Sequence, residues 1–162
     1  MEDLRVLLFL HIINAFLLSM TGLRLFGYRS SLRTLITLSI TYGVAVWIVR
    51  GIYGHYHIPL GTHTIILTLI FSLLIRTIGK VNWGIALGAA LVSSSLGMLG
   101  GGISILIIQF FQLSVTDVLS NPWLHVLIGH TENVFLVIML IVNSRFGFTL
   151  TKPLEKQVSR DN

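Results

Sequence analysis

Five long apolar segments, separated by short polar stretches, dominate the sequence. They cover residues 4–20, 34–49, 58–75, 81–113 and 123–142. A helix of about 20 apolar residues crosses the hydrocarbon core of a bilayer, which is about 30 Å thick. The pattern therefore predicts an all-α, polytopic membrane bundle over residues 1–143, followed by a short basic cytoplasmic tail over residues 144–162.

The fourth segment has an awkward length. As one helix it would extend roughly 48 Å, and split at its central glycines it would give two halves of about 23 Å, each short for a span. Small residues recur at every fourth position, so one helical face lets a neighbouring helix approach closely. This small-residue stripe consists of Ala89, Ser93, Gly97 and Gly101. It favours a single helix with a kink at Gly100, Gly101 and Gly102, and hence five spans, with six as the alternative.

The distribution of charge agrees with five spans. The chain is 54% hydrophobic and only 10% charged, whereas soluble domains carry about 25% charged residues. Most of its Lys and Arg residues lie in stretches 21–33, 76–80 and 144–162, while residues 114–122 carry only Asp117. Because basic loops stay in the cytoplasm, we expect the N-terminus outside and the C-terminus inside. Basic residues in these places indicate lipid headgroups rather than nucleic acid as partners.

Polar side chains within two apolar segments are the first candidate site. Glu132 lies near the middle of the last segment, with His130 and Asn133 beside it, and the first segment carries His11 and Asn14. Ionisable groups inside a membrane usually face a bundle interior or a wet cavity. If the two helices are neighbours, this group can relay protons, sense pH or bind a polar ligand. The alternative is a set of interhelical hydrogen bonds that only hold the helices together.

Three histidines in the stretch HYHIPLGTH are the second candidate. His55 and His57 would point to one side of an extended segment, and His63 follows six residues later. Three imidazoles can hold zinc or copper at the outer membrane surface. The alternative is that they are simply solvated. No other cofactor is expected, and the absence of cysteine excludes thiolate metal sites and disulfides.

The stretch from Phe111 to Val142, FQLSVTDVLSNPWLHVLIGHTENVFLVIMLIV, resembles the end of the multi-span sensor region of bacterial GHKL-type sensor histidine kinases, whose membrane domain is peptide-pheromone-receptor-like. The matching residues are Leu113, Ser114, Asp117, Leu119, Asn121 and Pro122. No histidine follows His130, so a kinase part with its phosphoacceptor is not expected in this chain. The resemblance implies a sensor-like domain in a bacterial cytoplasmic membrane, either free-standing or the input half of a kinase.

Three functions stay open from the sequence. The favoured one is a non-catalytic sensory or protein-interaction module, with the lipid bilayer and another membrane protein or a second copy as partners. The first alternative is a small transporter or channel subunit that uses Glu132. The second is a membrane enzyme with a histidine-bound metal.

Overall fold

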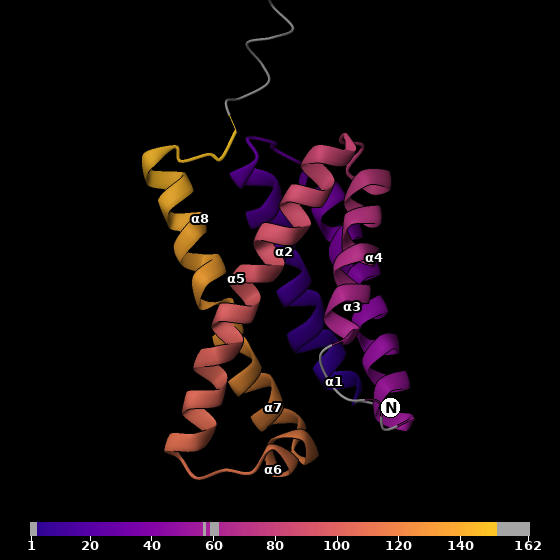
Figure 1. Cartoon of the computed structure of the whole chain (residues 1–162), viewed down its shortest axis with the longest axis vertical. Coiled ribbons are helices and arrows are strands. Elements are labelled where there is room, and N and C mark those ends of the chain that lie inside the picture. The colour runs from indigo at the N-terminus through magenta and orange to yellow at the C-terminus, as the bar shows by residue number, and fades with distance from the viewer. Residues whose placement is uncertain (1–2, 57, 59–61, 152–162) are drawn as a thin grey trace, which may run out of the picture.

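The computed structural model describes residues 3–56, 58 and 62–151, and within them every regular element is a helix. The all-helical prediction is thus confirmed for this part of the chain. The elements are α1 (Leu4–Val6), a π-helical turn (Leu7–His11), α2 (Ile12–Leu25), α3 (Leu32–His55), α4 (Thr62–Ile78), α5 (Trp83–Phe110), α6 (Val115–Ser120), α7 (Pro122–Gly129), a 3-10 turn (His130–Asn133) and α8 (Val134–Phe146). They form an elongated bundle of long rods (Figure 1).

Side-chain caps fix where these helices begin. The hydroxyl of Ser31 accepts a hydrogen bond from the backbone N–H of Thr34 at the start of α3, and Asn82 caps α5 in the same way. Asn121 caps α7, with Pro122 in the first turn, where a missing N–H costs nothing. α3 extends beyond the apolar segment 34–49 at both ends, whereas α5 lies within the segment 81–113.

Four stretches of helix are long and apolar enough to cross a membrane: Leu4–Leu25, Leu32–His55, Trp83–Phe110 and Pro122–Phe146. The fifth rod, α4, is apolar but has 17 residues. Large apolar side chains also cover the outside of the bundle, among them Leu69, Leu91 and Leu106, each more than half exposed. Such a surface suits lipid rather than water, and these features support a membrane-spanning protein.

The fourth apolar segment is one continuous helix. α5 runs through Gly100, Gly101 and Gly102 without interruption. The helical break falls instead in the last segment, where the 3-10 turn His130–Asn133 separates α7 from α8. The interruption therefore lies in the segment that packs against the glycines, and the predicted kink at Gly100, Gly101 and Gly102 stays a prediction.

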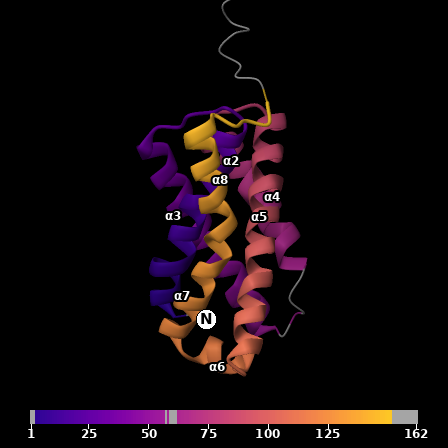
Figure 2. The same cartoon turned by 90° about the vertical axis from the view of Figure 1, so that its left-hand side faces the viewer.

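α2 is the central rod of the bundle. It packs against α3 on one side and against α5 and α8 on the other, as Figure 2 shows for the helices that surround it. Close approach to α5 depends on Gly22, because a Cβ there would lie 2.7 Å from the carbonyl oxygen of Ala89. The apolar core continues between α3 and α4, where the rings of Tyr42 and Phe71 stack at 4.4 Å. This packing leaves a space between α2 and its neighbours that holds the candidate site.

Candidate functional site

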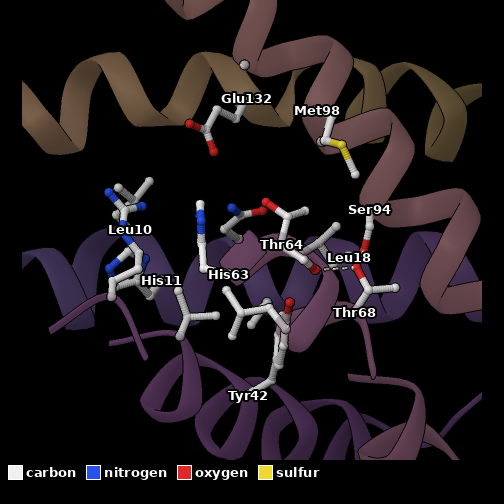
Figure 3. Close-up of a pocket in the computed structure, with 17 residues that line it drawn as sticks. Leu10, His11, Leu18, Tyr42, His63, Thr64, Thr68, Ser94, Met98 and Glu132 are labelled. Carbon is white, nitrogen blue, oxygen red and sulfur yellow. Dashed lines mark hydrogen bonds between the residues drawn. The ribbon is translucent and has the colours of Figure 1, made fainter. Parts of the chain in front are cut away.

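A cavity of about 240 Å³ lies inside the bundle, between α2, α3, α4, α5 and the 3-10 turn. We call it the central cavity. Its apolar wall includes Leu10, Leu18 and Met98. Its polar lining is rich for an apolar bundle and consists of His11, Asn14, Tyr42, Arg50, His63, Thr64, Thr68, Ser94 and Glu132. Figure 3 shows these side chains converging from four helices and from the interrupted last segment.

Glu132 reaches the central cavity because the last segment is interrupted there. Its carboxylate points into the cavity, toward the imidazole of His63 (Figure 3). The backbone at Glu132 lies against α5, where a Cβ built at Gly100 would overlap the Glu132 carbonyl oxygen. A residue without a side chain at position 100 is thus required for the 3-10 turn to sit where it does.

Two hydroxyl groups stabilise the interruption. A 3-10 turn disturbs the regular ladder of backbone hydrogen bonds, and within a bundle other groups must satisfy the freed carbonyls. Thr131 Oγ1 donates to the carbonyl oxygen of Ile128 at 2.6 Å, and Ser104 Oγ from α5 lies 2.6 Å from Thr131 Oγ1 and 3.4 Å from the same carbonyl. α5 thereby supplies both the space and the hydrogen bonding that the break needs.

Arg50 is the charged residue that the sequence analysis did not assign to this site. It extends from the C-terminal part of α3 into the lining of the central cavity, where its positive charge attracts the Glu132 carboxylate. The available signal was a lone arginine at the end of an apolar segment, at the boundary of a loop with no other Lys or Arg. The sequence cannot show that the arginine turns back toward the bundle.

His11 and Asn14 line the central cavity together with Glu132. His11 is 3% exposed and ends the π-helical turn, a distortion often found at functional sites. Asn14 Oδ1 is buried and has no hydrogen-bond partner among the described residues. A polar atom in that state carries a free-energy cost that a bound molecule or water can remove.

His130 and Asn133 lie outside the lining of the central cavity. The side-chain amide nitrogen of Asn133 is 3.3 Å from Nδ1 of His130. Asn133 is buried, and its Oδ1 has no partner among the described residues. The structure therefore divides the polar group of the last helix: Glu132 faces the cavity, and its two neighbours face each other.

The histidines of the second candidate that the structure describes, His55 and His63, have different surroundings. His55 packs edge-on against Tyr56, and His63 against Tyr53 at 5.6 Å, while His63 also lines the central cavity. His57 lies outside the described residues. Within the described ranges, no group of three His, Cys, Asp or Glu side chains could hold a metal ion. The three-histidine metal site stays a prediction.

The small-residue stripe has several surroundings along α5. Ala89 and Ser93 are fully buried where Gly22 approaches. A Cβ at Gly97 would meet Leu18 at 3.8 Å, and Gly101 lines the central cavity. Beside Gly102 there is open space. The stripe therefore makes a close helix contact at Ala89 and Ser93 and lines the central cavity at Gly101.

Comparison of the chain with protein-family models, with curated proteins and with solved structures finds no match. The function must therefore be inferred from the chemistry of the central cavity. It brings together a guanidinium, a carboxyl group, two imidazoles, an amide and several hydroxyls in a space the size of a small molecule.

Proposed function

We propose that the chain is a non-catalytic sensory module of a bacterial cytoplasmic membrane that binds a small polar molecule in the central cavity. The observation that carries this proposal is that Arg50 and Glu132 face one cavity from separate helices. Ionisable groups inside a membrane bundle are costly and usually mark a ligand or ion path. The resemblance of residues 111–142 to sensor regions supports the same reading.

The lining favours a zwitterionic ligand. A molecule that carries an ammonium and a carboxylate, such as a free amino acid, can pair with Glu132 and Arg50 at once. Asn14 and Thr68 offer further hydrogen bonds, and Leu10, Leu18 and Met98 can accept an apolar side chain. A cavity of about 240 Å³ is smaller than the usual drug-sized pocket, which suits a ligand of this size.

In this proposal the ligand acts on the interrupted helix. Glu132 belongs to the turn between α7 and α8, so a ligand that binds it more tightly in one position of that turn shifts the population toward that position. α8 leads directly to residues 144–162. With the N-terminus outside and the C-terminus inside, as the basic loops favour, the central cavity lies in the outer half of the bundle and the signal leaves on the cytoplasmic side.

A proton-coupled transporter is the second candidate, because one specific observation favours it. Transport sites are commonly built where a membrane helix is discontinuous, and Glu132 lies within such an interruption. A transporter would move its substrate across liposomes and lose this activity in Glu132→Gln. A sensory module would bind the ligand without net flux.

Binding is tested by thermal unfolding of the protein in lipid nanodiscs, with free amino acids as probes and matched amines and carboxylic acids as controls. A ligand at 100 times its Kd stabilises the folded protein by about 2.7 kcal/mol. We expect an amino acid to raise the unfolding temperature of the wild type and of Arg33→Gln, an exposed control of equal charge change. Arg50→Gln and Glu132→Gln should each lose that shift. If no amino acid stabilises the wild type, the zwitterion proposal is wrong.

A further inference from the structure

A second pocket lies at the other end of the bundle, between the end of α2, the turn into α3 and the end of α8. We call it the basic pocket. It has a volume of about 470 Å³ and shares no lining residue with the central cavity. Its polar lining consists of Arg24, Tyr28, Arg29, Ser30, Asn143 and Ser144.

The charge of the basic pocket is entirely positive. Arg24 and Arg29 contribute two guanidinium groups, and none of the described lining residues is acidic. The acidic side chains within the described ranges belong to the first turn of the chain, to α6 and to the 3-10 turn, which lie in the other half of the bundle or at its middle (Figure 1). Two guanidinium groups without a neighbouring carboxylate form a site for an anion, and guanidinium geometry suits phosphate oxygens.

Neutral donors complete the anion site. The hydroxyl oxygen of Ser30 is buried and has no hydrogen-bond partner among the described residues. Ser30 directly precedes the cap of α3, a helix of 24 residues, so the positive end of that helix lies at the pocket. The donor and the helix end are therefore placed near the two arginines, and no acidic side chain of the described residues lines the pocket with them.

The rim of the basic pocket is fixed by the chain that follows α8. Asn143 Nδ2 donates to the carbonyl oxygens of Arg24 and Phe148, at 3.3 and 2.7 Å. The backbone N–H of Leu150 donates to the carbonyl oxygen of Leu25 at 2.6 Å, and Thr151 donates to that of Phe26. These hydrogen bonds fix the backbone from Arg24 to Phe26, so this part of the site needs less ordering on binding.

We propose that the basic pocket binds a phosphate group. The source that its lining favours is the headgroup of an anionic phospholipid, because Met20, Leu23 and Leu35 form an apolar floor on which acyl chains can begin. The pocket also lies where α3 and α8 both pack on α2. The proposal is independent of the ligand of the central cavity.

The test is thermal unfolding of the whole chain in a non-ionic detergent with three additions: phosphatidylglycerol, phosphatidylcholine and inorganic phosphate. We expect phosphatidylglycerol to stabilise the wild type more than phosphatidylcholine does. Arg24→Gln and Arg29→Gln should each raise the phosphatidylglycerol concentration needed for half of the effect about tenfold, as loss of one charge-assisted contact predicts. Ser30→Ala should raise it less.

The matched control is Arg33→Gln, which removes the same charge four residues beyond Arg29, at a residue that does not line the basic pocket. It should leave the response to phosphatidylglycerol unchanged. An equal loss in Arg33→Gln would mean a diffuse surface charge and would overturn the proposal, as would a wild type that neither phosphatidylglycerol nor inorganic phosphate stabilises. Stabilisation by inorganic phosphate to the same extent, with the same variant pattern, would support the site and identify a free phosphate as its ligand.

Discussion

Gly100 of α5 packs directly against the backbone of Glu132, so closely that a methyl group on Gly100 would overlap the Glu132 carbonyl oxygen. A continuous helix thus uses its glycine cluster to admit the interrupted backbone of its neighbour. The position of the acidic side chain in the central cavity depends on this contact.

Alanine substitutions along the glycine cluster should therefore differ by position. Gly100→Ala forces the 3-10 turn away from α5, and we expect it to cost about 1–3 kcal/mol of stability, as overpacking does. Gly102→Ala is the matched control, because a Cβ there meets open space. It should be neutral or stabilising by up to about 1 kcal/mol, since alanine has the higher helix propensity. Thermal unfolding in detergent measures both, and an equal effect of the two substitutions would contradict the assigned contact.

The hydroxyl groups of Ser104 and Thr131, which support the interruption, should have coupled effects on the stability of the protein. Ser104→Ala removes one of the groups near the Ile128 carbonyl, and we expect a loss of about 0.6–2 kcal/mol. Ser95→Ala is its control, because Ser95 bonds only within its own helix and faces outward. In a double-mutant cycle with Thr131→Val, the two losses should not add. Additive losses would show that Ser104 and Thr131 act separately.

Asp117 gives a prediction on pH dependence outside the apolar helices. The hydroxyl and the backbone N–H of Ser114 donate to its carboxylate at 2.5 and 3.1 Å, and they hold the pKa of Asp117 below its ordinary value. Because the folded-state pKa is the lower one, this contribution to α6 is complete above the ordinary carboxyl pKa and is lost as the pH falls through the lowered value. Stability at neutral pH should be insensitive to it.

Ser114→Ala should raise the pKa of Asp117 toward its ordinary range, because both the hydroxyl donor and the capping box are then lost. NMR titration of the Asp117 carboxyl carbon measures this directly. Ser120→Ala is the control, since the Ser120 hydroxyl donates to the Asp117 backbone carbonyl and not to the carboxylate. An unchanged titration in Ser114→Ala would contradict the assigned cause.

The proposed orientation predicts the side of each loop. A reporter fused after residue 162 should be active in the cytoplasm, and a cysteine introduced at Thr116 should react with a membrane-impermeant reagent applied outside. Five spans with the N-terminus outside require both results. A reporter that is active outside the cytoplasm would contradict this orientation and would reverse the direction in which a signal leaves.

The sequence predicts the helices well because burial in lipid demands long apolar segments, and Ser31, Asn82 and Asn121 mark their starts. It does not predict the interruption at 130–133, which has no proline. The available signal was a run of weak helix formers around Glu132. The glycine cluster predicts a kink from sequence alone, but glycine permits both a bend and a close contact. Whether the glycines bend their helix or allow a close contact depends on the helix that packs against them.

Which residues line the central cavity also depends on tertiary packing. His11, Asn14 and Glu132 can be selected from sequence as polar residues in apolar segments. Arg50 and His63 lie at the ends of segments, where a charged or polar residue is ordinary, and their distance along the chain from Glu132 gives no sign of proximity. Hydrophobic periodicity reports how much of a helix is apolar but not which helix it meets.

α2 reaches both pockets, with Asn14 near one end and Arg24 at the other. Asn14 and Arg24 are about 15 Å apart along one stiff rod. A displacement of this rod along its axis would change the geometry of both pockets together, and any effect of one ligand on the affinity of the other would be reciprocal. Gly22 lines neither pocket, but its close contact with Ala89 fixes the position of α2 against α5. Substitution of Gly22 by a larger residue would alter the geometry of both pockets.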